Sequence, residues 1–223
     1  MVLPEISSEM DMVIKSSLRS GDETTLTTNI LGKDIKRLIE PRWLNDVLIN
    51  EYIRLLETRG GSEKFPKVFG FNTHFYTSFR DFGYENISRF IRKCNIFNYE
   101  ILLIPIHLGN HWCLAVIDLK QKIFSYYDSL AAGSNNQCIK LLFTYLKYEH
   151  NRRLGRIMNM RGWVTRIEKD IPQQGNRYDC GMFLCKFAEF TCRRAKISFQ
   201  QSDMTYYRRR MVYELVKSQL MYP

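Results

Sequence analysis

The sequence lacks an apolar run long enough to cross a membrane. Its most apolar stretches, residues 101–106 and 114–117, are separated by two histidines and other polar residues, whereas a membrane-spanning helix needs about 20 apolar residues. The N-terminus carries Glu5 and Glu9 and has neither a basic start nor an apolar core, so a secretory signal is missing. We therefore expect a protein that crosses no membrane and stays inside the cell.

The sequence also lacks a Cys-x-x-Cys pair. The six cysteines have spacings unlike those of zinc modules, and the chain does not have the small size of a disulfide-stapled secreted domain. We expect most of them to be buried free thiols, and we expect neither a metal nor a cofactor. They are Cys94, Cys113, Cys138, Cys180, Cys185 and Cys192.

What the chain does contain is typical of a compact domain. Its 223 residues are 45% hydrophobic, 25% charged and 13% aromatic, which excludes disorder over the whole chain. No repeat, low-complexity tract or linker divides it, so we predict one domain over residues 1–223, with residues 1–25 as a peripheral N-terminal segment. Apolar periodicity predicts an α+β fold in which helices flank a central mixed sheet. The predicted strands cover 101–106, 112–118 and 123–127, and the predicted helices cover 33–39, 44–56, 141–148, 180–194 and 203–215.

Charge is unevenly distributed along the chain. Residues 1–139 contain 16 Lys and Arg against 16 Asp and Glu, and residues 140–223 contain 17 against 7, so the net charge of +10 arises in the C-terminal part. The arginine runs 152–153, 193–194 and 208–210 are compatible with a basic nucleic-acid-binding module. No nucleic-acid recognition motif accompanies them, however, and charge runs usually form solvated faces. We therefore expect no dedicated nucleic-acid site, and an excess charge that is spread over helix surfaces and can attract an acidic partner.

The strands predicted at 112–118 and 123–127 bring His111 close to Asp128. With Leu119 and Lys120 at the turn centre, antiparallel pairing places His111 directly opposite Asp128, with Cβ atoms about 4.5–5.5 Å apart. A carboxylate in this position bonds the imidazole and fixes its tautomer and orientation. The turn has no Asn-Gly or Asp-Gly, so a shifted register stays open.

Cys180 lies in an Asp-Cys-Gly sequence at the start of an apolar helix pattern. The helix dipole and a nearby imidazolium can convert such a thiol into a nucleophilic thiolate. Gly181 permits close approach of a substrate backbone, and Gln174 offers a side-chain donor to an oxyanion. The residues alone leave two interpretations open: a catalytic site, or a buried cysteine that begins a core helix near a structural histidine and a turn aspartate.

The order His-Trp, Tyr-Tyr-Asp-Ser, then Pro-Gln-Gln-x-x-x-x-Asp-Cys-Gly resembles the SUMO-specific (sentrin-specific) cysteine proteases of the Ulp/SENP type, in the adenain-like class. Further matches are Trp-Leu-Asn-Asp at 43–46, Phe-Asn-Thr at 71–73, Pro-Ile-His-Leu-Gly at 105–109 and Arg-x-Arg-Met at 208–211. The resemblance extends from about residue 3 to the C-terminus. It implies a papain-like, adenain-like fold and a complete catalytic domain.

The resemblance also implies a reaction. Cys180 would be the nucleophile, His111 the general base and then acid, Asp128 the residue that orients it, and Gln174 part of the oxyanion hole. Attack on the last glycine of the modifier would give a thioester that water hydrolyses. The implied partners are SUMO and SUMO-conjugated proteins, the implied outcomes are precursor maturation and deconjugation from lysines, and the implied location is the nucleus.

Four further residues acquire substrate-binding roles from the resemblance. Trp43 and Trp112 would close over the Gly-Gly tail of the modifier, because rigid aromatic walls leave a slot that only residues without side chains can pass. Asp46 would pair with an arginine of the modifier, and His107 would lie near the tail tunnel. Without the resemblance, the tryptophans would be core residues and Asp46 an ordinary early-helix carboxylate. The spacing of His107 and His111 is similar to that in zinc-binding helices, but the required Glu is missing and strand residues follow.

One position departs from the family pattern, since Arg177 stands where the family usually has glycine. If the backbone there needs a positive φ, an arginine would strain or shift the loop. A protease of the same fold that acts on a Nedd-type modifier remains an alternative. An inactive modifier-binding relative is disfavoured because all four catalytic positions are occupied.

Overall fold

The computed structural model describes residues 3–91, 94–130 and 135–221. A five-stranded mixed sheet runs through the molecule in the order β1-β2-β3-β4-β5. The three central strands are antiparallel, and each edge strand is parallel to its neighbour. The strands are β1 (Val68–Gly70), β2 (Ile101–His107), β3 (Trp112–Asp118), β4 (Ile123–Tyr127) and β5 (Val164–Ile167).

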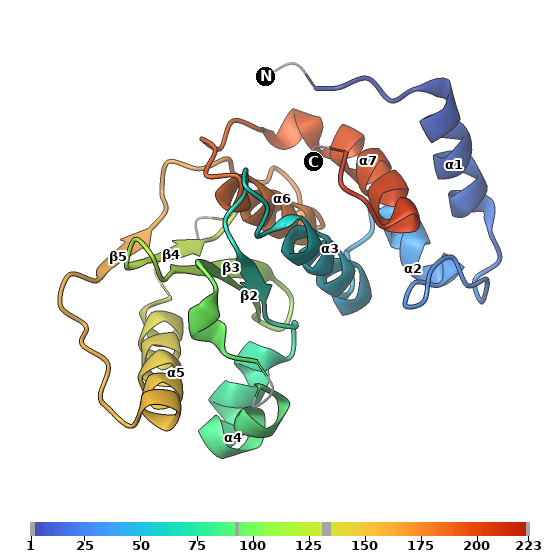
Figure 1. The fold of residues 1–223 in the computed structure, drawn as a ribbon. Coiled ribbons are helices and arrows are strands. Elements are labelled where there is room, and N and C mark those ends of the chain that lie inside the picture. Colours follow the sequence, from blue (N-terminus) through green and yellow to red (C-terminus); the bar gives the residue numbers. More distant parts are fainter. Residues whose placement is uncertain (1–2, 92–93, 131–134, 222–223) are drawn as a thin grey trace.

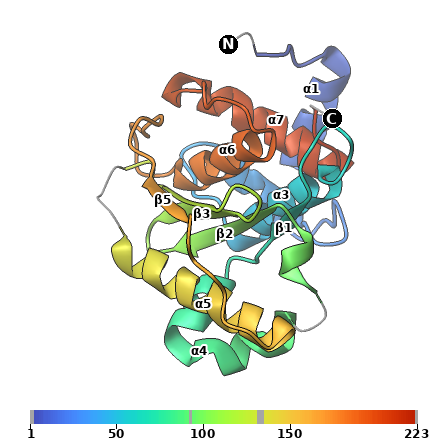
Figure 2. The same ribbon diagram turned by 60° about the vertical axis from the view of Figure 1, so that its left-hand side comes forward.

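Helices cover both faces of this sheet (Figure 1). Helices α3, α6 and α7 lie on one face and α4 and α5 on the other, while α1 packs on the outside of α7 (Figure 2). The helices are α1 (Ser8–Arg19), α2 (Gly32–Ile35), α3 (Asp46–Arg59), α4 (Phe75–Ile91), α5 (Asn136–Leu154), α6 (Cys180–Cys192) and α7 (Met204–Lys217). Three short 3₁₀ helices also occur, at Lys36–Leu38, Ile96–Asn98 and Gln201–Asp203.

The central strands are buried on both faces, which explains their nearly continuous apolar sequences. Alternate residues enter different clusters: Leu103 and Leu114 pack with α3, α6 and α7, whereas Leu102 and Ala115 pack with α4 and α5. Successive side chains of a strand point to opposite faces, so one sheet supports two separate cores. Burial on both sides makes β3 a rigid support for residues at its end.

Helix α3 has clear local signals at both ends. The Asn45 side chain accepts a hydrogen bond from the Leu48 N–H at 3.2 Å, and Gly60 follows the last helical residue. Leu48 and Tyr52 lie one turn apart on the buried face of the helix. The cap therefore fixes where α3 begins, and with it the positions of the preceding Trp43 and of Asp46.

The structure confirms the predicted α+β class and all three predicted strands, with β2 one residue longer than expected. It also confirms the helices at α3, α6 and α7, with ends that differ by a few residues. Helix α4 and strands β1 and β5 were not predicted. Helix α4 is kinked at Gly83, where φ is 74°, strand β1 has only three residues, and β5 is largely exposed, so each has a weak periodic signal. Helix α5 is longer than the predicted 141–148.

The arginine runs prove to be ion-paired, and the prediction that they lie on solvated helix surfaces is wrong for two members. Arg208 and Arg210 are only 1% and 2% exposed. Every arginine of these runs has a carboxylate partner: Arg152 and Arg153 with Glu149, Arg193 with Glu189, Arg194 with Asp118, Arg208 with Asp179, Arg209 with Asp11 and Arg210 with Glu214. Their charge is used within the molecule, which weakens the nucleic-acid alternative.

The cysteines behave as predicted. All six are free thiols, and all except the half-buried Cys94 are buried. Within the part of the chain that the structure describes, no helix has the length and apolar content that a membrane span requires.

Candidate active site

The predicted register between β3 and β4 is wrong, although the contact it was meant to explain exists. Leu114 pairs with Tyr127, so the register extended to His111 places it opposite Leu130 and not opposite Asp128. The loop 119–122 is longer than the predicted turn, because Asp118 accepts a hydrogen bond from the Gln121 N–H at 2.8 Å. His111 and Asp128 therefore meet diagonally just beyond the strand ends, a separation that long side chains can span.

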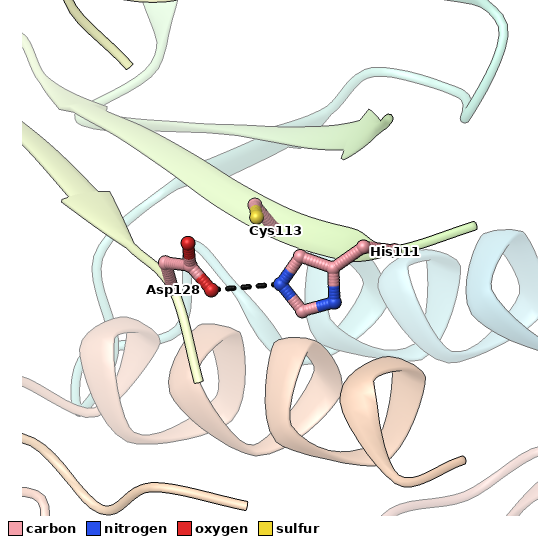
Figure 3. A group of neighbouring side chains, drawn as sticks. All are labelled: His111, Cys113 and Asp128. Carbon is pink, nitrogen blue, oxygen red and sulfur yellow. Dashed lines mark hydrogen bonds and ion pairs between the residues drawn. The ribbon is translucent and has the colours of Figure 1, made fainter. Parts of the chain in front are cut away.

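His111 and Asp128 form a tight hydrogen-bonded pair. The Nε2 atom of His111 lies 2.7 Å from Oδ1 of Asp128, and both side chains are about nine-tenths buried (Figure 3). The same Oδ1 accepts the Leu130 N–H at 2.9 Å, which holds the carboxylate in place. With the proton on Nε2 facing Asp128, Nδ1 is the ring nitrogen left for a reacting group.

The electrostatic environment favours the protonated imidazole. Burial lowers the pKa of His111, but side-chain interactions with Asp128, Cys113 and Cys180 outweigh it and raise the pKa well above its ordinary value. The interaction with Cys180 also shows that its thiol lies within reach of the ring. The three catalytic-type side chains predicted from the sequence thus meet at one place.

Cys180 is the first residue of α6 and is 2% exposed. Asp179 occupies the N-cap position, but its side chain makes no capping hydrogen bond, so the first N–H groups of the helix remain available to another acceptor. A Cβ atom on Gly181 would lie 2.9 Å from the Cβ of Leu44. Glycine is therefore required here by the close packing of α6 on the segment before α3, a reason that sequence reasoning did not anticipate.

Gln174 lies in a loop tied to the residue after Asp128. Its N–H donates to the Ser129 carbonyl at 2.9 Å, and the Ser129 hydroxyl donates to Gln174 Oε1 at 2.6 Å. The amide Nε2 donates to the Asn176 carbonyl at 2.6 Å. These contacts orient the amide through its oxygen and one of its N–H groups.

Cys113 adds a thiol beside the pair, as Figure 3 shows. The ligating atoms of His111, Cys113 and Asp128 all lie within 4.8 Å of one another, so these residues offer three metal-ligating atoms. Nε2 is already engaged by Asp128 at 2.7 Å, however, and burial raises the pKa of the Cys113 thiol, so it stays protonated. The three side chains therefore hold protons, one on His111 Nε2 and one on the Cys113 sulfur. His107 lies at the end of β2 and not on a helix.

The four predicted substrate-binding residues surround one cavity of about 470 Å³. Trp43, 44% exposed, and Trp112, 8% exposed, both line it together with Asp46 and His107. His107 pairs with Trp112 across β2 and β3, and their ring centroids are 4.3 Å apart. The cavity thus has aromatic, acidic and imidazole groups in its wall. It lies at the start of β3, where Trp112 directly follows His111.

Charged and polar groups in this wall influence one another. Burial lowers the pKa of His107, nearby His74 acts in the same direction, and Asp46 opposes them. His107 is therefore neutral at cellular pH. Nε2 of His74 lies 3.5 Å from Oδ2 of Asp46, so a residue that the sequence analysis did not single out contacts the acidic group of the cavity.

Sequence reasoning also missed the residues that support the site. Ser129 links Asp128 to Gln174, and Asp179 bonds Arg208 beside the nucleophile. The only available signals were the serine of Tyr-Tyr-Asp-Ser and the first arginine of Arg-x-Arg-Met, which carried no assigned role. The concern over Arg177 is unfounded, because this exposed residue is not among the non-glycine residues with positive φ, which are Lys122, Arg194 and Ser218.

A cysteine at a helix N-terminus, a histidine held by a buried aspartate and an oriented glutamine amide are the components of a cysteine-protease site. Comparison with family models assigns residues 42–220 to the Ulp1 protease family, C-terminal catalytic domain. The chain belongs to this family.

Known relatives agree with this assignment. A sentrin-specific protease of Caenorhabditis elegans is 39% identical over 227 residues, covering 99% of this chain and 32% of the relative. Human sentrin-specific protease 2 is 35% identical over 226 residues, covering 98% of this chain and 38% of the relative. The chain thus spans about a third of the length of these two relatives.

Solved structures share the fold. The SUMO protease Ulp1 with its catalytic cysteine oxidised to a sulfonic acid has a TM-score of 0.85 and 28% identity, with 96% of this chain and 97% of that chain covered. The C-terminal Ulp1 protease domain in complex with Smt3, the yeast orthologue of SUMO, has a TM-score of 0.84 and 29% identity, with 97% and 98% covered.

Proposed function

We propose that this chain is the catalytic domain of a SUMO-specific cysteine protease, which matures SUMO precursors and removes SUMO from lysine side chains. The observation that carries the proposal is the His111 imidazole, held at 2.7 Å by Asp128 while it interacts with Cys180 at the start of α6. The family and the sentrin-specific relatives support the choice of substrate.

The first half of the reaction is acylation. The Cys180 thiolate attacks the carbonyl carbon of the terminal glycine, forming the C–S bond and placing negative charge on the carbonyl oxygen. The Gln174 amide and the N–H groups at the start of α6 face that oxygen. As the intermediate collapses, the C–N bond breaks and His111 Nδ1 gives its proton to the leaving amine, which leaves a thioester.

The second half of the reaction is hydrolysis. The neutral His111 accepts one proton from water, and the resulting hydroxide adds to the thioester carbonyl. The C–S bond then breaks to release the thiolate and the carboxylic acid, which loses its remaining proton to solvent and leaves as the carboxylate. Asp128 stabilises the imidazolium that forms and keeps Nδ1 directed at the reacting atoms. Net consumption is one water molecule per amide bond.

The cavity beside the site accounts for selectivity toward a Gly-Gly tail. Trp43 and Trp112 are large and rigid, so a tail between them must lack side chains. We assign Asp46 to an arginine of the modifier and His107 to the wall of the tail channel. Both side chains line the same cavity as the tryptophans.

We further propose that residues 1–223 act as one catalytic domain with residues 1–25 at its periphery, and that the protein works in the nucleus. Helix α1 lies outermost, against α7, which supports a peripheral role. Fluorescence microscopy of the tagged protein in its native cells would test the location. An exclusively cytoplasmic signal would contradict the nuclear assignment.

The substrate proposal is tested with C-terminal fluorogenic amides of SUMO, ubiquitin and a Nedd-type modifier. We expect turnover of the SUMO probe only, and loss of that turnover in Cys180→Ser. Preferred turnover of the Nedd-type probe would establish the alternative specificity on the same site. Equal turnover by the Cys180→Ser protein would overturn the assignment of the nucleophile.

A further inference from the structure

We propose that Arg208 is a positioning residue. It holds the loop that precedes Cys180, here called the nucleophile loop (residues 174–179), in a fixed position relative to the segment that carries Trp43. This inference rests on the proposed function, because it takes Cys180 as the nucleophile and Trp43 as a wall of the tail slot. Arg208 lies in α7 and touches neither group directly. It acts through the backbone next to each of them.

Arg208 is 1% exposed, and its guanidinium bonds two separate segments of the chain. Toward the nucleophile loop, Nε donates to Asp179 Oδ1 at 2.8 Å and Nη2 lies 2.7 Å from the same oxygen. Nη2 also donates to the Tyr178 carbonyl at 3.2 Å. Toward the segment before α3, Nη1 donates to the Arg37 carbonyl at 3.1 Å and Nη2 to the Arg42 carbonyl at 3.0 Å.

These bonds end immediately beside the two functional residues. Asp179 directly precedes Cys180, and Arg42 directly precedes Trp43. The two segments also touch, because a Cβ on Gly181 would lie 2.9 Å from Leu44 Cβ. A displacement of Arg208 would therefore move the nucleophile and the tail slot relative to each other.

Asp179 connects Arg208 to other residues of the nucleophile loop through further hydrogen bonds. Its Oδ2 accepts hydrogen bonds from Asn176 Nδ2 at 2.7 Å and from Gln201 Nε2 at 2.8 Å. Gln201 Oε1 in turn accepts the Gly175 N–H at 2.7 Å. The residue following Gln174 is thus connected to the residue preceding Cys180, and the charge at the centre of this connection is balanced by Arg208.

Arg210, two positions along α7, provides the contrast. It is buried like Arg208, but its carboxylate partner Glu214 lies one turn further along the same helix, at 2.8 Å from Nε. This pair lies within α7 and involves neither the loop before Cys180 nor the segment that carries Trp43. Lysine can replace the charge of either arginine, but it has no planar fork to bond a carboxylate and two carbonyls at once.

The test compares Arg208→Lys with the matched control Arg210→Lys. Thermal unfolding first identifies a temperature at which both variants are folded. We then measure kcat and KM with the SUMO amide probe, the second-order rate of Cys180 alkylation by iodoacetamide, and the affinity of SUMO for each variant in a Cys180→Ala background. We expect Arg208→Lys to lower kcat/KM by about 10²-fold, to change the alkylation rate and to weaken SUMO binding. Arg210→Lys should stay within about threefold of the parent in all three.

The readouts separate positioning from simple destabilisation. If Arg208→Lys matches Arg210→Lys in alkylation rate, kcat and SUMO affinity, the positioning role is overturned, even if both variants melt earlier. If Arg208→Lys does not fold, Asp179→Asn replaces it, because the amide keeps the shape and loses the charge. A normal alkylation rate in that variant would equally contradict the proposal. An inactive parent protein would refute the proposed function instead, whereas alkylation is measured without any substrate.

Discussion

The two faces of the sheet each have a buried core but are held together in different ways. The face covered by α3, α6 and α7 contains the buried pair Arg208–Asp179, whose partners are far apart in the sequence. The face covered by α4 and α5 contains a cluster of aromatic rings around Tyr145, in contact with Phe71, Phe75 and Phe79. Its buried Glu149 is paired with arginines of its own helix and accepts one hydrogen bond from the Tyr84 hydroxyl of α4.

This difference indicates what each face must do. Burying a charge is costly unless it is paired and fully bonded, so long-range buried pairs are weak evidence of stability alone. Aromatic rings bury much apolar area, and the free energy gained from burying that area is not directional. The first face therefore specifies positions around Cys180, and the second supports β3 and β4 from behind.

The largest effect on catalysis is expected from Asp128→Asn, a substitution beside the face that is covered by α3, α6 and α7. The asparagine keeps the shape, but its amide can donate to His111 Nε2 and drive the proton to Nδ1, so that the ring cannot accept one. We expect kcat for the SUMO probe to fall by 10³–10⁴-fold, on the order of the loss seen for such substitutions in related triads. Steady-state kinetics checks this.

Asp118→Asn is the control, because Asp118 is an equally buried carboxylate at the far end of β3 and pairs with Arg194. We expect its kcat to remain within about threefold of the parent, since the site lies at the other end of the strand. Equal losses in the two variants would mean that Asp128 acts only through stability.

A smaller loss is expected at Gln174. Gln174→Ala removes one oxyanion donor and should lower kcat by about 10²–10³-fold with little change in KM. The neighbouring Gln173 is exposed and bonds only the Ile171 carbonyl among the described residues, so Gln173→Ala should leave kcat unchanged. A loss confined to KM in Gln174→Ala would contradict its place in the oxyanion hole.

The raised pKa of His111 predicts a pH dependence of stability. Above about pH 6.5 the unfolded chain loses the imidazole proton while the folded chain keeps it. This group's contribution is therefore complete below that pH and declines as pH rises toward the folded pKa, by at most about 1.4 kcal/mol per pH unit. Urea unfolding of Cys180→Ala, in which the thiol does not titrate, should show a decline between pH 6.5 and 9. The double variant with His111→Gln should lack that part of the decline, and identical slopes would rule the pairing out.

The smallest effect is expected on the aromatic face. The Tyr145 hydroxyl is buried with no hydrogen-bond partner among the described residues, so Tyr145→Phe should be neutral or stabilise the fold by up to about 1 kcal/mol. Tyr84, which donates to Glu149 at 2.5 Å, is the counterpart, and Tyr84→Phe should cost about 1–3 kcal/mol. Neither should alter kcat/KM. Denaturant unfolding measures the change in stability, and the SUMO probe measures kcat/KM. A loss of kcat/KM in Tyr145→Phe would contradict the claim that this face only supports the site.

The sequence predicted the parts whose signal is local. Apolar runs placed β2, β3 and β4, and motif order identified the residues that meet at His111. The predicted register was wrong because it centred the turn on Leu119 and Lys120. It left out the hydrogen bond from the Gln121 N–H to Asp118, which belongs to the longer loop 119–122. Arg208 was assigned to a charged surface because a buried arginine is recognised only through distant partners, such as the Arg42 carbonyl. Long-range polar contacts of this kind produce no periodic pattern of apolar residues in the sequence.

The central claim is that Cys180 attacks the carbonyl at the end of a SUMO tail. The most direct measurement uses SUMO whose terminal glycine carries an electrophilic trap, with peptide mass spectrometry to locate the adduct. The account predicts a single adduct on Cys180 with SUMO, and none with the ubiquitin equivalent. An adduct on Cys113 or another cysteine, or equal labelling by ubiquitin, would contradict it.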